Sequence, residues 1–155
     1  MPDRTDDIRQ LLHEAGVSGE VRVLPESAHT AAQAAAALGC DPGAIASSLV
    51  FQAGDDPLLV MTSGVHRVDT DLLSRELGVP VQMARAKVVK QVTGQPIGGV
   101  SPIGHPARLR TLVDQSLQGY DELWAAAGTR NSVFCIGFDD LVRITHGTVA
   151  RVAED

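Results

Sequence analysis

The sequence predicts a single α/β domain, residues 1–155, built around a mixed β-sheet. Short apolar segments alternate with amphipathic helical segments along the chain, which is the pattern of α/β proteins. Two of the apolar segments are joined only by a turn-forming Asp55-Asp56-Pro57, which favours an antiparallel hairpin over a purely parallel sheet. No repeat or linker divides the chain, and 155 residues suffice for one domain with its own core.

Helices are predicted where apolar residues recur with helical spacing between capping and stop signals. Residues 5–15 have Thr5 as a candidate N-cap and Gly16 as a stop. The alanine-rich segment 29–39 has Thr30 as its candidate N-cap. The remaining expected helices are a short one that begins at Asp41-Pro42 and the segments 70–77, 85–94 and 139–147.

Strands are predicted where short apolar runs are bounded by turn residues. The expected strands cover residues 21–25, 48–53, 58–63, 79–84, 107–117 and 132–138, with a short last strand at 148–152. The segment 121–128 fits a helix or a strand on periodicity alone. Ser47 and Ser48 are expected at a helix-to-strand junction, where hydroxyl groups often satisfy backbone groups.

The composition excludes several classes of protein. The chain is 44% hydrophobic, which argues against disorder, and its formal charge of −6 argues against a broad basic face for nucleic acid. A small local basic site stays compatible with this charge. No apolar run is long enough to span a membrane, and the first ten residues lack the apolar core of a signal peptide. The sequence therefore predicts a cytosolic protein without a membrane partner.

No metal or cofactor motif is present in the sequence. Cys40 and Cys135 are far apart and form no CxxC pair, so two free thiols are expected. The five histidines form neither an HxxH nor an HExxH pair. The glycine-rich segment in the middle of the chain lacks the endings of a P-loop and of a dinucleotide fingerprint. We expect no metal and no cofactor.

That glycine-rich segment, TGQPIGGVSPIGHP at residues 93–106, has two interpretations. It is either a plain connector or a backbone surface shaped for a ligand. Gly98 and Gly99 allow close approach of another molecule, and N–H groups at Gly98, Gly99 and Val100 can donate to a carbonyl or an oxyanion. Composition alone favours the connector slightly.

Other candidate residues also have structural interpretations. Arg67 can hold an anion at the start of a helix, but a solvated Arg67 beside an N-capping Asp69 is the simpler reading. N-capping likewise accounts for Thr30. Neither Ser47 nor Ser48 lies in a GxSxG elbow, so a Ser-His-Asp triad is not expected.

Four segments together resemble the YbaK/EbsC/ProX group of trans-editing aminoacyl-tRNA deacylases, whose domain also occurs inside bacterial prolyl-tRNA synthetases. They are HTAAQAAAALG at 29–39, IASSLVF at 45–51 with PLLVMTSGVHRVD at 57–69, TGQPIGGVSPIG at 93–104, and FDDLVRIT at 138–145. The resemblance implies an α/β domain with a largely antiparallel, barrel-like mixed sheet surrounded by helices. It also makes 121–128 a strand paired with 132–138.

The resemblance implies hydrolysis of the ester that joins a wrong, small amino acid to the 3′ end of a tRNA, as in Cys- or Ala-tRNA(Pro). The partner is then the aminoacyl-tRNA 3′ end, and a synthetase is a second partner that the resemblance allows. Gly98, Gly99 and Pro102 would form the wall against the terminal adenosine and the ester. The further substrate-binding candidates are Thr30, Ser48, Arg67, Asp69, Val100 and His105.

Ser47 departs from the pattern of this group, in which a lysine that is important for activity commonly occupies its place. Serine supplies a short neutral donor where lysine supplies a long charged one. One hypothesis keeps the deacylase: Gly98 and Gly99 orient the ester carbonyl while Ser47 or Ser48 holds a water. The alternatives are a binding module that holds an aminoacyl-tRNA 3′ end, a free amino acid or a nucleotide without catalysis, and a hydrolase of another small ester or amide.

Overall fold

The computed structural model describes residues 4–17, 21–25, 30–95, 100–129 and 131–153. The α-helices are α1 (Arg4–Glu14), α2 (Ala31–Leu38), α3 (Thr70–Leu77), α4 (Ala86–Thr93) and α5 (Phe138–Thr145). The strands are β1 (Val21–Val23), β2 (Ile45–Ala53), β3 (Asp56–Ser63), β4 (Val81–Met83), β5 (Arg110–Asp114), β6 (Leu123–Ala126), β7 (Ser132–Ile136) and β8 (Thr148–Ala150). Short 3-10 turns, η1 (Pro42–Ala44) and η2 (Gln115–Gly119), precede β2 and follow β5.

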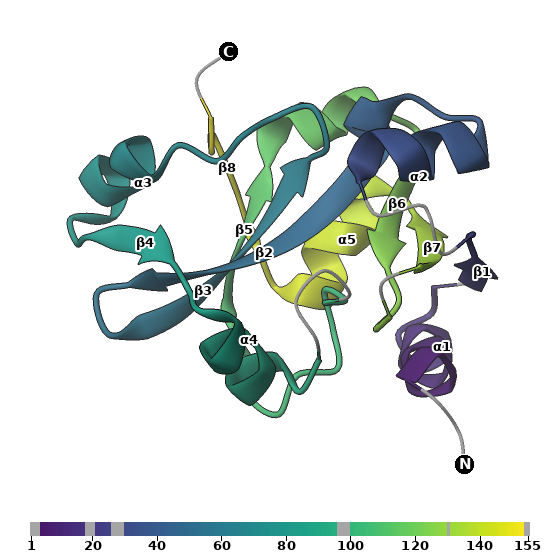
Figure 1. Cartoon of the computed structure of the whole chain (residues 1–155), viewed down its shortest axis with the longest axis horizontal. Helices are drawn as coiled ribbons and strands as arrows, with labels where there is room; N and C mark the ends of the chain where they lie inside the picture. Colours follow the sequence, from purple (N-terminus) through teal and green to yellow (C-terminus); the bar gives the residue numbers. More distant parts are fainter. Residues whose placement is uncertain (1–3, 18–20, 26–29, 96–99, 130, 154–155) are drawn as a thin grey trace.

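All eight strands join one mixed sheet in the order β1-β7-β6-β2-β3-β5-β8, with β4 also paired to β2. Four pairings are antiparallel, and the pairings β2–β6, β3–β5 and β5–β8 are parallel. The long β2–β3 hairpin crosses the middle of the molecule (Figure 1). The predicted α/β fold with a mixed sheet is confirmed, as is the hairpin.

Helices cover both faces of the sheet. One face packs against α1, α4 and α5, whose buried side chains Ile8, Val89 and Leu141 share a core cluster with Met61. The other face packs against α2 near β6 and against α3 near the β2–β3 hairpin. No helix in the described part of the chain is long and apolar enough to cross a membrane.

Two strand predictions needed correction. Strand β2 begins at Ile45, not at residue 48, because Ile45 and Ala46 already pair with β6. Ser47 and Ser48 therefore lie within the strand and not at its junction with a helix. Strand β5 is shorter than the predicted 107–117, because Asp114 caps η2 by accepting from the Ser116 N–H at 2.9 Å. The segment 121–128 contains β6, antiparallel to β7, as the resemblance implied.

The junction of β3, η1 and α2 generates a prediction about Gly64. A Cβ added to Gly64 would lie 2.5 Å from the Pro42 carbonyl oxygen and 2.6 Å from the Ala31 Cβ. Gly64→Ala should therefore lower the free energy of unfolding by about 1–3 kcal/mol, measured by urea denaturation. Gly119→Ala is the matched control, because a Cβ there meets nothing within 4 Å. Equal stability of the two variants would contradict this account of the junction.

Candidate functional site

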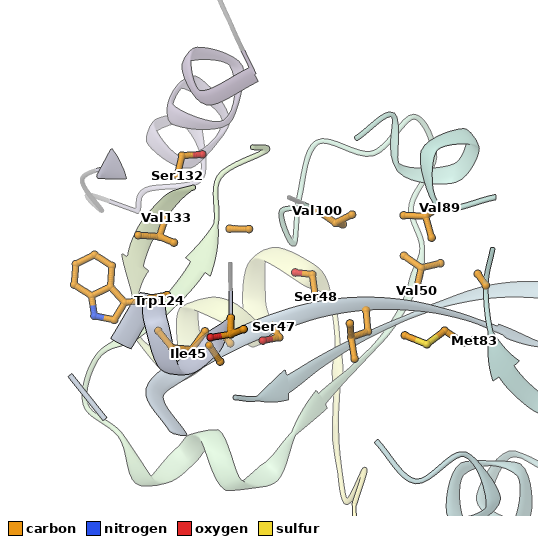
Figure 2. A pocket seen from close by; sticks show the side chains of 17 residues that line it. Ile45, Ser47, Ser48, Val50, Met83, Val89, Val100, Trp124, Ser132 and Val133 are labelled. Carbon is orange, nitrogen blue, oxygen red and sulfur yellow. The ribbon is translucent and has the colours of Figure 1, made fainter. Parts of the chain in front are cut away.

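A pocket of about 290 Å³ opens beside the middle of β2. Figure 2 shows Trp124, Ser132 and Val133 on one side of it and Val89 and Val100 on the other, with Ser47 and Ser48 between. The described lining residues come from α2, β2, β6, β7, the β4–α4 segment and the end of the glycine-rich loop. They are Thr30, Ala31, Ala34, Ile45, Ala46, Ser47, Ser48, Leu49, Val50, Met83, Ala84, Val89, Val100, Trp124, Ala126, Ser132 and Val133.

The pocket lies where one side of β2 has no neighbouring strand. Along its other side β2 pairs with β3 from Ala46 to Ala53. On the pocket side, β6 pairs only with Ile45 and Ala46, and β4 pairs only from Phe51 onward. Among the described residues, no strand fills the interval between them. Six consecutive residues of β2, 45–50, line the pocket, because the pocket faces the edge of the strand.

The register shows which peptide group points into this interval. The Gly64 N–H donates to the Ile45 carbonyl at 2.8 Å, so odd-numbered residues of β2 turn their backbone groups toward β3. Even-numbered residues face the opposite side, and there Val50 already accepts from the Ala84 N–H at 3.1 Å. The N–H and C=O of Ser48 are therefore directed into the pocket, and within the described ranges no backbone group pairs with them.

The described lining is mostly apolar and carries no charged side chain. None of the described residues that line the pocket is an Asp, Glu, His, Cys, Lys, Arg or Tyr. Its polar groups are four hydroxyls and the Trp124 indole N–H, and three of the hydroxyls already have partners, among them Ser132, which bonds to the Thr129 hydroxyl. Ser48 donates to the Met61 sulfur at 3.1 Å, and the Thr30 hydroxyl accepts from the Gln33 N–H at 3.1 Å. The pocket therefore offers a small ligand apolar contact, hydroxyls and one open peptide group.

The glycine-rich loop is held at both ends by a buried amide. Gln95 is only 4% exposed, and its carbonyl oxygen accepts from the Ser101 N–H at 2.6 Å while its amide nitrogen donates to the Ile103 carbonyl at 3.3 Å. The Thr93 hydroxyl supports the same turn by accepting from the Gln95 N–H at 3.0 Å. This clamp fixes Val100, which is 3% exposed, in the lining of the pocket.

The other predicted residues of this loop lie in different places. Gly98 and Gly99 fall outside the described residues. Pro102 and His105 line a separate surface hollow with Gly104 and Arg108. The His105 Nε2 contacts the Ser101 carbonyl at 2.9 Å, and burial lowers the pKa of His105, against the effect of this hydrogen bond. Among the loop candidates that the structure describes, it places Val100 in the main pocket.

Arg67 and Asp69 are not among the residues that line the pocket. Arg67 is exposed in the connection between β3 and α3. Asp69 is the N-cap of α3, where its carboxylate accepts from the Leu72 N–H at 3.0 Å. Thr30 caps α2 in a reciprocal capping box with Gln33, and it also lines the pocket. The capping roles predicted for Thr30 and Asp69 are confirmed.

A buried polar row behind the pocket was missed by sequence reasoning. Ser47 lies directly across from Thr62 on β3, and the Thr62 hydroxyl donates to the Asp114 carboxylate on β5 at 3.3 Å. Directly opposite residues share a face of the sheet, so the three side chains form one row. Asp114 is 1% exposed. Only its position at the end of an apolar strand could have drawn attention to it.

Hydrogen bonds keep the Asp114 carboxylate ionised. Burial by itself raises its pKa, but bonds from the Ser63 N–H, the Ser116 N–H and hydroxyl, and His66 outweigh burial and hold the pKa below its ordinary value. The His66 Nδ1 is hydrogen-bonded to the Asp114 carboxylate at 2.9 Å, and the Ser116 hydroxyl oxygen lies 3.3 Å from that same nitrogen. A catalytic triad needs opposite ring nitrogens for the two partners, so this cluster is not one.

Comparisons with known proteins agree on one kind of domain. The family model described as the aminoacyl-tRNA editing domain matches residues 25–144. The uncharacterized protein YwhH of Bacillus subtilis (strain 168) is 32% identical over 114 residues, which are 73% of each chain. The proline–tRNA ligase of Geobacter sp. (strain M21) is 33% identical over 86 residues, and the match covers 55% of this chain but only 15% of the ligase.

Solved structures give the same result for the fold. A crystal structure of a proposed trans-editing enzyme for prolyl tRNA synthetase superposes with a TM-score of 0.94 and 35% identity, covering 100% of this chain and 99% of the other. A crystal structure of a hypothetical protein superposes with a TM-score of 0.86 and 26% identity, covering 98% and 100%.

The Gln95 clamp generates a stability prediction. Gln95→Leu leaves the buried Ser101 N–H without its acceptor, so we expect the free energy of unfolding to fall by about 1–3 kcal/mol. The measurement is the urea midpoint at pH 7. Gln91→Leu, on the exposed side of α4, is the control and should change stability by less than about 0.5 kcal/mol. If the two variants were equally stable, the clamp would not hold the loop.

The Asp114 network generates a prediction about pH. The pKa of Asp114 is lower in the folded protein than its ordinary value of 3.8, so its stabilisation is complete above that pH and is lost as the pH falls through the folded pKa. Asp114→Asn should destabilise the protein at pH 6, and its difference from wild type should shrink below pH 3.8. Urea unfolding across this range measures both. Asp55→Asn, at the exposed hairpin turn, is the control variant.

Proposed function

Because this chain belongs to the aminoacyl-tRNA editing domain family, we propose that it hydrolyses the ester of a small, mischarged amino acid on a tRNA of the proline type. The relatives support this choice of tRNA, since they include proline–tRNA ligases and a proposed trans-editing enzyme for prolyl tRNA synthetase. The observation that carries the proposal is the small apolar pocket with the open peptide group of Ser48 at its floor.

The open peptide of Ser48 suits an aminoacyl ester. In an antiparallel sheet, a hydrogen-bonded pair exchanges two bonds, from each N–H to the opposite C=O. An aminoacyl group carries an α-ammonium donor and an ester carbonyl acceptor with the same spacing as one residue of a strand. In the proposed complex, the Ser48 C=O accepts from the ammonium and the Ser48 N–H donates to the ester carbonyl.

This placement selects the side chain of the amino acid. A residue that pairs with Ser48 would direct its side chain to the face on which Ser48 itself lies. On that face the lining residues include Ala46, Val50, Val89 and Val100, all of them in the same core cluster. These apolar side chains suit a small apolar group, such as the methyl of alanine or the thiol of cysteine. Discrimination of one added methylene by such a pocket amounts to roughly 10–200-fold.

The chemistry is a hydrolysis in which a water oxygen attacks the ester carbonyl carbon. The bond from that carbon to the ribose 3′ oxygen breaks, and this oxygen takes up the proton that the water releases. Because no described lining residue titrates near neutral pH, the proton passes through the vicinal 2′-hydroxyl of the substrate. Ser47 holds the water, while the N–H groups of Ser48, Gly98 and Gly99 stabilise the negative charge on the carbonyl oxygen.

A second candidate function is binding of the aminoacyl end without hydrolysis. It is favoured by one observation, the absence of any charged side chain among the described residues of the pocket, with Ser47 at the place of the lysine common in this group. Either function places the protein in the cytosol with the aminoacyl-tRNA 3′ end as its partner. A synthetase that hands over the tRNA is a further partner in this proposal.

The test of the proposal is a panel of tRNAs charged with Ala, Cys, Ser or Thr, incubated with the wild-type protein. We expect release of alanine or cysteine from proline tRNA at least about tenfold faster than release of threonine. Gly99→Val should abolish this release if the loop lies against the ester. No release from any member of the panel would exclude the deacylase.

Ser47→Lys separates the two candidate functions. If the wild-type protein is inactive and Ser47→Lys hydrolyses a member of the panel, the present protein is a binding module derived from the enzyme. If the wild-type protein is active, the binding-only function is excluded. The control is Ser132→Ala, which changes another hydroxyl of the pocket lining. Ser132→Ala adds no charge to the pocket wall, and we expect it not to create activity.

A further inference from the structure

We propose that the exposed face of α4, formed by Lys87 and Lys90 with Arg85 at the N-cap, binds phosphates of the tRNA strand whose 3′ end enters the pocket. This inference rests on the proposed function, because it takes an aminoacyl-tRNA as the ligand. It addresses the question of how an acidic protein holds a polyanion.

Positive charge is concentrated in one part of the sequence. From Leu77 to Val113 the chain has five lysine and arginine residues and no aspartate or glutamate. That segment carries a formal charge of +5 in a protein whose total is −6, so the rest of the chain carries −11. Both lysines of the chain lie on α4. The segment that contains α4 is therefore formally positive, although the protein as a whole is acidic.

The fold places this charge at the rim of the pocket. Val89 of α4 is 2% exposed and lines the pocket, whereas Lys87 and Lys90 are exposed and, three residues apart, adjacent on the helix surface. Helix α4 follows β4, the strand that pairs with β2 beyond the open interval (Figure 1). A helix is about 10–12 Å across, so its exposed face lies within reach of the first few nucleotides of a strand that leaves the pocket on this side.

These lysines have no evident role in holding the fold. In the described part of the chain, neither Lys87 nor Lys90 forms an ion pair, whereas Arg9 and Arg143 pair with Asp6 and Asp140.

One carboxylate limits the extent of the basic face. Asp7 of α1 lies in a hollow with Gly94 at the far end of α4, so the positive face is the part of the helix nearest Ala84 and the pocket.

The experiment compares two substrates with the same ester. Alanyl-tRNA(Pro) presents the phosphates, and 3′-O-alanyl-adenosine lacks them. The variants are Lys87→Glu and Lys90→Glu, with Arg151→Glu as a control that reverses an exposed charge outside the basic segment. We measure kcat/KM on both substrates at several salt concentrations, together with binding of a non-hydrolysable alanyl-tRNA(Pro) in which an amide replaces the ester.

Loss of one phosphate contact should lower the affinity for the amide-linked tRNA roughly five- to eightfold at 0.1 M salt, and should reduce the slope of log affinity against log salt by about 0.7–0.9. The ratio of kcat/KM on the tRNA to that on alanyl-adenosine should fall by the same factor. Arg151→Glu should leave both quantities unchanged.

The outcomes separate this inference from the proposed function. Active wild type with unchanged ratios and salt slopes in both lysine variants overturns the role of α4 and leaves the deacylase intact. Wild type that binds the amide-linked tRNA without hydrolysing the ester, with binding weakened in the lysine variants, supports the role of α4 and rejects the deacylase. Equal weakening by Arg151→Glu would show a general charge effect and would also overturn the proposal.

Discussion

The site depends on how the neighbours of β2 share its two sides. Strand β3 occupies one side along nearly the whole length of β2, while β6 and β4 take only the two ends of the other. A strand interior normally has both of its edges paired, since an unpaired peptide group away from water is costly. The interval at Ser48 is thus a polar opening in an otherwise apolar wall, and the surrounding elements complete a pocket around it.

Buried polar groups hold the sides of this pocket in place. Gln95 fixes the loop that contributes Val100, and Asp114 joins β3, β5 and η2 behind Ser47. Such groups are stabilising only when their hydrogen bonds are complete, so each of them tolerates little displacement of its partners. The ligand-facing residues can therefore be small and uncharged, because their positions are set by the polar groups behind them.

The sequence predicted most helices, because capping is local chemistry: Thr30 and Asp69 cap the helices that they were expected to cap. It also predicted the α/β class and the β2–β3 hairpin, because apolar periodicity and turn residues are local signals too. The start of β2 was mispredicted because Ile45 pairs with Trp124, which is far along the chain. Local periodicity does not indicate such a distant contact. The resemblance to the editing group identified Ser47 and Ser48 as candidates.

Other features of the site depend on tertiary structure alone. The open peptide of Ser48 follows from register, which the sequence does not display. Asp114, at the end of an apolar run, and Gln95, within the glycine-rich segment, were missed because each looks like a solvated polar residue until its burial is known. Gly98 and Gly99 lie outside the described residues, so their role stays a prediction.

The pairing of distant strands also determines when the pocket can form during synthesis of the chain. The pocket takes one wall from residues 30–50 and another from residues 124–133, and β2 and β6 meet in parallel only when both are present. Contacts of such long sequence separation form late and slow folding. A growing chain on the ribosome therefore has no complete pocket until its last quarter has emerged, so a domain of the aminoacyl-tRNA editing family gains this pocket only when its own synthesis is nearly complete.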